Sequence, residues 1–197
     1  MLTLSAPRFR RPRLQVDSAL RNGELLLLVM LAAGVLAGGV VGFFSLQNGD
    51  AGPLEDYVAS RFLCASLPTA LLNASGFFLL LGAAATSYLG VLALPVVVFL
   101  RGYLLSCAVS GLYALFSLRG LGCALLLRGI PGLLVIPCFY CAACAALASS
   151  RRLLSLRLGQ PGPAARGGLG CIPLSAGVVL FDAFYGYYIV PAMFSGF

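Results

Sequence analysis

The chain contains no histidine, no lysine and no tryptophan, and only 10% of its 197 residues are charged. Histidine is the usual general base and the commonest metal ligand, and serine or cysteine nucleophiles normally need it as a partner. The apolar segments of the chain also lack the pair of carboxylates that could replace histidine. An enzyme that acts within the membrane therefore ranks last among the candidate functions. We therefore expect no enzymatic activity, no catalytic residues, no cofactor and no metal site.

The charges that are present are mostly positive and unevenly placed. Thirteen arginines outnumber six acids and give a net charge of +7. The arginines cluster beside apolar runs and do not line one face of a helix, as expected for a membrane protein oriented by its positive loops. We expect no nucleic-acid partner.

Long apolar runs make up most of the chain, which is 60% hydrophobic with a mean hydropathy of +1.00. A soluble domain of this composition would expose large apolar patches. A helix of about 20 apolar residues crosses a hydrocarbon core of roughly 30 Å. Runs of about that length lie at residues 25–44, 70–89, 91–116, 130–148 and 169–194. The sequence predicts an all-α, polytopic transmembrane helix bundle of about five spans.

Two connections predict the orientation of this bundle in the cell membrane. Residues 46–69 hold three acids against one arginine, and residues 151–167 hold four arginines. Short arginine-rich connections stay in the cytoplasm, so the first connection is expected outside and the second inside. The N-terminus is then cytoplasmic and the C-terminus external.

The predicted domain organisation is simple. Residues 1–20 are interpreted as a disordered, basic cytoplasmic tail before an uncleaved first span, and residues 21–197 as a single transmembrane helical domain. Apolar positions at helical spacing over residues 52–67 also predict a short interfacial helix.

Some of the helical segments are expected to be broken or re-entrant. Pro95 interrupts the third apolar run, and residues 117–132 are apolar yet bounded by arginines and broken by glycine and proline. The latter pattern favours a surface-lying or re-entrant helix over a full span.

Glycines at four-residue spacing mark one face of the first span. Gly34, Gly38 and Gly42 form a stripe that lets another helix approach closely, as in GxxxG packing. The pattern predicts a packing face without identifying the partner helix.

Two opposite charges fall within apolar runs. Arg101 lies in the third run and Asp182 in the last. A charge inside a span is costly unless it is paired, hydrated or able to snorkel, and it is a functional hypothesis by default. We expect the two to form an intrabundle charge pair or a shared polar lining.

Cysteines at positions 138, 141 and 144 have the spacing of a metal or cluster site. They lie among alanines in a predicted span, and no fourth ligand follows at a suitable distance. Helix packing by a ridge of small residues is therefore favoured over metal binding.

Residues 87–106 contain a motif of Phe99, Leu100, Arg101 and Gly102 that resembles the central region of stage II sporulation protein M and its family. The run from Pro131 to Pro137, the small-residue helix after it and the basic end at residues 151–152 are also similar to that family. So is an acid in the last span ahead of Pro191. Family members place this acid one turn later, where this chain has Gly186, so the position of Asp182 departs from the family pattern.

The resemblance implies a non-enzymatic membrane scaffold that recruits or couples two peptidoglycan hydrolases at the septum during engulfment of the forespore. Membrane lipids and membrane-associated cell-wall hydrolases are then the expected partners, and self-association is left open. The residues themselves also support an alternative, a transport or permease-like subunit. Interrupted apolar segments, with Pro95 and Pro131, and intramembrane charges are features of transporters.

Overall fold

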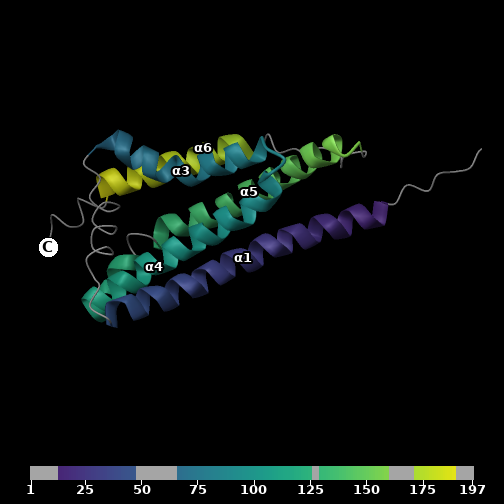
Figure 1. Cartoon of the computed structure of the whole chain (residues 1–197). Coiled ribbons are helices and arrows are strands. Elements are labelled where there is room, and N and C mark those ends of the chain that lie inside the picture. Colours follow the sequence, from purple (N-terminus) through teal and green to yellow (C-terminus); the bar gives the residue numbers. More distant parts are fainter. Residues whose placement is uncertain (1–12, 48–65, 126–128, 160–170, 190–197) are drawn as a thin grey trace, which may run out of the picture.

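The computed structural model describes residues 13–47, 66–125, 129–159 and 171–189. These residues are 94% helical and include no strand. Five of the helices are long and apolar enough to cross a membrane. The structure in Figure 1 therefore confirms the predicted all-α, multi-pass bundle.

The helices follow the predicted apolar runs closely. Their bounds are α1 Arg13–Gln47, α3 Leu67–Ala85, α4 Gly90–Ala124, α5 Ile130–Arg157 and α6 Cys171–Phe184, which continues into the π-helical turn η3 Tyr185–Ile189. Because α1 begins at Arg13, the last part of the predicted disordered tail is helical. Residues 1–12, most of the predicted interfacial helix and Pro191 lie outside the described residues.

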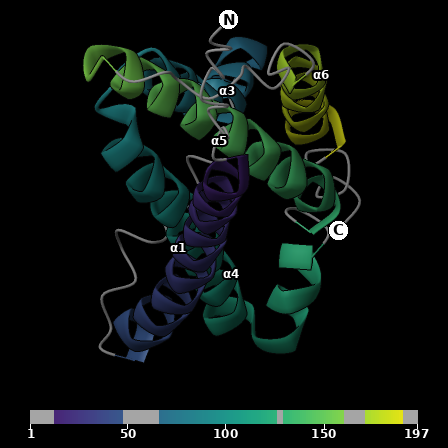
Figure 2. The same cartoon turned by 90° about the vertical axis from the view of Figure 1, so that its right-hand side faces the viewer.

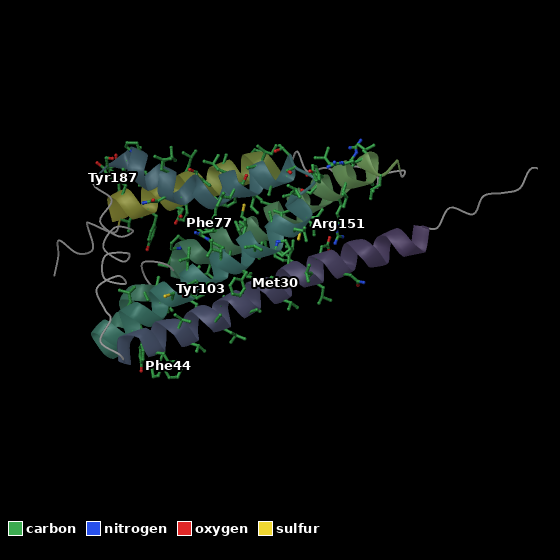
Figure 3. The ribbon with its side chains drawn as sticks, in the orientation of Figure 1. Met30, Phe44, Phe77, Tyr103, Arg151 and Tyr187 are labelled. Atoms are coloured by element: carbon green, nitrogen blue, oxygen red, sulfur yellow. The ribbon has the colours of Figure 1, made fainter. Side chains whose placement is uncertain are left out.

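The bundle has two sides. α1 runs along α4, while α6 packs against α3 and α5 (Figures 1 and 2). Figure 3 places Phe44 and Tyr187 toward one end of the bundle and Arg151 toward the other. In the predicted topology, the end with Arg151 is the cytoplasmic one.

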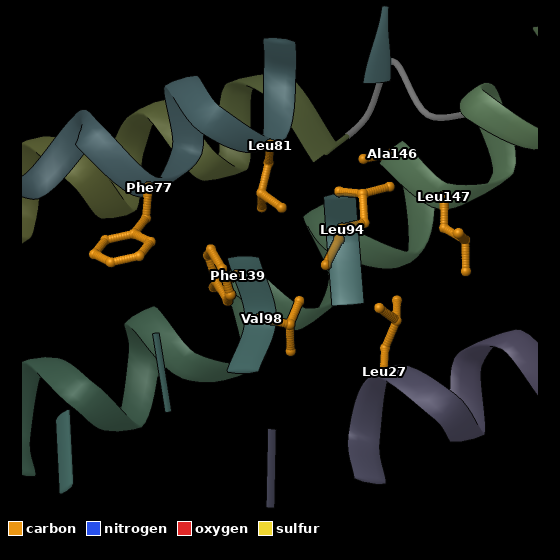
Figure 4. Packing of buried hydrophobic residues seen from close by; sticks show 9 residues of the cluster. Leu27, Phe77, Leu81, Leu94, Val98, Phe139, Ala146 and Leu147 are labelled. Atoms are coloured by element: carbon orange, nitrogen blue, oxygen red, sulfur yellow. The ribbon is translucent and has the colours of Figure 1, made fainter. Parts of the chain in front are cut away.

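Buried side chains from four helices meet where the two sides join (Figure 4). Phe139 of α5 is only 2% exposed and lies edge-on to two rings of α3, with centroids 6.3 Å from Phe77 and 5.7 Å from Phe78. Leu27 of α1 and Leu94 of α4 are fully buried beside them. Lipid tails are as apolar as these side chains, so close packing is what holds this core together.

The structure corrects the expected break in the third run. Pro95 is buried within α4, which continues without interruption from Gly90 to Ala124. Pro95 is the sixth residue of α4, beyond the first turn in which a missing backbone donor has no cost. Transmembrane helices tolerate such a proline when neighbouring groups and local adjustments satisfy the freed backbone carbonyl. The candidate span ends at Tyr113, and the last turns of α4 bend toward the start of α5 (Figure 2). Residues 117–124 thus form the end of a long helix.

Candidate functional site

The predicted glycine stripe packs against α4. Gly34 and Gly38 are buried, and a Cβ atom at either position would collide with a backbone carbonyl of α4, that of Phe99 or that of Tyr103. Figure 3 shows Tyr103 of α4 where that helix runs beside α1. Only glycine permits this backbone approach, so the structure supplies the partner helix that the sequence left open.

The close approach continues along both helices. A Cβ atom at Gly42 would lie 2.8 Å from Cβ of Ser110 on α4. From the opposite side, a Cβ atom at Gly102 would lie 2.6 Å from the carbonyl oxygen of Leu31 on α1. Glycines of both helices therefore contribute to one interface. Gly102 belongs both to this interface and to the motif of residues 99–102.

Arg101 lies near the middle of its span, about 17 Å along the helix from Gly90. Its guanidinium carbon is 4.9 Å from the ring centroid of Phe77 and 6.0 Å from that of Phe139. A cation over an aromatic face gains about 0.5–2 kcal/mol, the larger values applying when it is desolvated. The charge is thus held between aromatic rings of α3 and α5.

A small cavity adjoins the same arginine. It has a volume of about 40 Å³ and is lined by Leu31 and Val35 of α1, Arg101 and Gly102 of α4, and Phe139 of α5, among others. The surface that lines it is apolar, and a buried water needs two to four polar partners, so the cavity is a packing gap and not a water or ligand site.

The four motif residues have different neighbours around α4. The Phe99 carbonyl and Gly102 contact α1, while Arg101 reaches the rings of α3 and α5. Leu100 is 41% exposed on the lipid-facing surface. Successive helical residues are about 100° apart, so four consecutive positions can face three environments. The motif thereby links the glycine contact to the half-buried arginine.

Asp182 lies in different surroundings. It is half-buried on α6, whose contact with α3 has a buried centre of Ala70 and Ala74 against Val179 and Ala183, with Phe78 and Tyr187 packed beside it. Within the described residues, no hydrogen bond or ion pair joins the Asp182 carboxylate to another group. α6 packs on α3 and α5, with little contact to the helix that carries Arg101. The pairing of the two charges stays a prediction.

Three contacts at the arginine-rich end were not anticipated from the sequence. The Ser150 hydroxyl of α5 donates to the carbonyl of Ala84 at 2.9 Å. The Arg157 guanidinium carbon lies 4.2 Å from the ring centroid of Tyr88, in the turn between α3 and α4. Arg151 lies against the backbone of α1 at Gly23. Serine in a small-residue helix and arginine at a membrane edge are common, so neither pattern names a partner.

The cysteine ridge of α5 is only partly packed. Cys138 is buried, Cys144 half-buried and Cys141 exposed, and within the described residues none of the three forms a disulfide. In the part of the chain that the structure describes, no group of three or more histidine, cysteine or acidic side chains is placed to hold a metal ion. Pro137, in the same helix, lies within α5 without ending it.

No family model, characterised protein or solved structure matches the chain. The resemblance to the stage II sporulation protein M family therefore rests on the motif residues themselves.

Proposed function

We propose that the protein is an integral membrane scaffold that recruits or couples membrane-associated peptidoglycan hydrolases. In an endospore-forming host, its place would be the septum during engulfment. The observation that carries the proposal is the position of the Phe99–Gly102 motif, which joins the glycine contact between α1 and α4 to the mid-membrane arginine. A motif in this position stabilises the arrangement of four helices, as a scaffold requires.

The size of the space beside Arg101 favours this role over solute transport through that point. Binding sites for small molecules usually enclose about 300–1,000 Å³. The cavity at Arg101 encloses about 40 Å³ and is walled by close-packed helices. Its charge is stabilised by aromatic rings, which points to a structural use of the arginine.

A transport or permease-like subunit is the second candidate. Arg101 and Asp182 lie at similar depths, about 17 Å and 15 Å along their helices from the same predicted side. Intramembrane charges near the midplane are typical of substrate and ion pathways. Solute-dependent uptake by vesicles containing the purified protein, lost in Asp182→Asn, would support this candidate and oppose the scaffold.

The scaffold is tested by purifying the tagged full-length chain from crosslinked membranes of its own host. We expect cell-wall hydrolases among the enriched proteins. Gly38→Leu should lose them, because it separates α1 from α4, while the matched variant Gly82→Leu should keep them, since a Cβ at Gly82 meets no atom within 4 Å. The scaffold proposal fails if hydrolases are no more abundant than in a purification of an unrelated multi-pass protein.

The orientation in the cell membrane belongs to the same proposal, since wall hydrolases act outside. A membrane-impermeant thiol reagent should label Cys64, which lies in the acidic connection outside the described residues. A Cys64→Ser variant is the control, because the remaining cysteines lie in or beside apolar runs. Labelling of Cys64 only after permeabilisation would reverse the predicted orientation.

A further inference from the structure

The last span is the least enclosed helix of the bundle. Only 11% of Ile172–Ile189 is buried inside the protein, against 39% for the span of α5. Figure 2 shows α6 at the edge of the molecule, and its far side carries exposed apolar residues such as Leu180 and Phe184. Most of this helix therefore faces lipid or another membrane protein.

This exposed helix nevertheless carries an acid. Asp182 is half-buried and lies about 10 Å along the helix from Ile189, the nearer end of the span. An aspartate side chain is too short to reach the interface over that distance, whereas a lysine or arginine can snorkel. No described group satisfies its carboxylate.

The backbone beside Asp182 is open to close approach. Gly186 lies one turn further along on the same face, and a Cβ atom there would meet no atom within 4 Å. The helix widens at this point into the π-helical turn Tyr185–Ile189. Such turns are rare and are often found at functional sites, because they change which groups the helix presents.

We propose that Asp182 and Gly186 form the docking face for a transmembrane helix of a partner protein that carries a basic side chain near the membrane midplane. The carboxylate supplies the charge complementarity, and the glycine lets the two backbones come close enough for a short side-chain contact. The inference rests on the proposed scaffold role and specifies how the scaffold would recognise a membrane partner.

A second copy of this chain does not fit the same face. Within the described spans, the basic residue nearest the midplane is Arg101, and its guanidinium lies between the rings of Phe77 and Phe139. To reach Asp182 of another copy, its side chain would have to give up its contacts with both rings. The fitting occupant is therefore a different membrane helix.

The test uses a designed single-span peptide of leucines with one central arginine, and a second peptide in which that arginine is leucine. Association of each labelled peptide with the purified full-length protein is measured by energy transfer in neutral-lipid vesicles. We expect the arginine peptide to associate about tenfold more strongly than the leucine peptide. Asp182→Leu and Gly186→Leu should abolish the difference, and Asp182→Glu should retain most of it.

The controls keep every outcome informative. Leu180→Asp combined with Asp182→Leu moves the acid to another face of α6 and should not restore binding. Equal association of both peptides with the natural protein would overturn the proposal. So would a preference for the arginine peptide that appears only in Arg101→Leu, because it would show that Arg101 occupies Asp182 in the natural chain.

The peptide measurement is independent of the hydrolases. If the peptide preference is found but hydrolases do not copurify with the natural protein, the docking face stands and the scaffold role fails. If hydrolases copurify equally with Asp182→Leu and the natural protein shows no peptide preference, the docking face fails and the scaffold role stands.

Discussion

The α1–α4 pair and the α6 helix pack in opposite ways, the pair by close backbone contact and α6 with most of its surface uncovered. In the pair, Gly34, Gly38 and Gly102 bring two backbones into contact along much of the membrane thickness. α6 instead touches α3 through small side chains and leaves most of its surface open. α6 also contains glycine, but a Cβ atom at its Gly177 or Gly186 would meet no atom within 4 Å.

The comparison shows that composition alone does not tell a packing glycine from an open one. Gly38 would place a Cβ against the carbonyl of Tyr103, whereas Gly82, Gly177 and Gly186 would place it in open space. The two groups should respond differently to the same substitution. We call the α1–α4 pair the tight half and the surface of α3 and α6 that carries the open glycines the open half. The tight half fixes the fold, and the open half is free to meet other molecules.

The largest expected effect is that of a bulky residue at the centre of the tight half. Gly38→Leu should lower the free energy of unfolding by about 3 kcal/mol, because the side chain forces α1 away from α4. The measurement is the denaturation of the purified protein in mixed micelles, followed by circular dichroism.

Gly82→Leu is the matched control in the open half, and it should change the free energy of unfolding by less than about 0.5 kcal/mol. Equal losses in the two variants would remove the distinction between the halves. They would also reduce the stripe of α1 to the ordinary glycine content of a membrane helix.

The second prediction concerns Arg101 and the aromatic rings that it contacts. Phe77→Leu should destabilise the protein by about 2 kcal/mol, since it removes both core volume and the ring nearest to the guanidinium. In the Arg101→Leu background, the same change should cost about 1 kcal/mol less, because the cation is gone.

Phe78→Leu serves as the control, because the Phe78 ring packs edge-on to Phe139, whereas the guanidinium lies over the rings of Phe77 and Phe139. Its cost should be the same with and without Arg101. If Phe77 and Phe78 behave alike in the two backgrounds, the aromatic rings do not stabilise the charge.

The number of spans and the use of the glycine stripe follow from the sequence, because both depend on local patterns. Twenty apolar residues must become a helix in lipid, and glycines four apart must share a face. The continuity of α4 through Pro95 does not follow. It depends on whether the surroundings satisfy the backbone carbonyl that the proline leaves without a donor, and the sequence does not show those surroundings.

The surroundings of Arg101 and Asp182 are even less predictable from the sequence. Arg101 and Asp182 are opposite in sign and similar in depth, which is all that one sequence can establish. Which helices are neighbours depends on the packing of every pair, so the rings of Phe77 and Phe139 were not foreseeable as partners of Arg101. The small contacts of Ser150 and Tyr88 are unpredictable for the same reason.

The third prediction tests a contact at the arginine-rich end of the bundle. Ser150→Ala should lower the free energy of unfolding by about 1 kcal/mol, because the hydroxyl joins α5 to the last turn of α3 in a part-buried site. Ser149→Ala is the control, since the Ser149 hydroxyl bonds only within its own helix. A loss that is no larger in Ser150→Ala would mean that this contact does not fix the two helices together.

The smallest effect is expected for the energetic coupling between Arg101 in the tight half and Asp182 in the open half. Arg101→Leu, Asp182→Leu and the double variant form a cycle, measured as free energies of unfolding and as protein levels in the membrane. Arg101 contacts rings of α3 and α5, and no described group pairs with Asp182, so we expect a coupling below about 0.5 kcal/mol. The pairing expected from the sequence makes the opposite prediction, because removing one charge would strand the other and the double variant would recover. Recovery would place both charges in one half of the bundle and leave α6 without a charge to offer a partner.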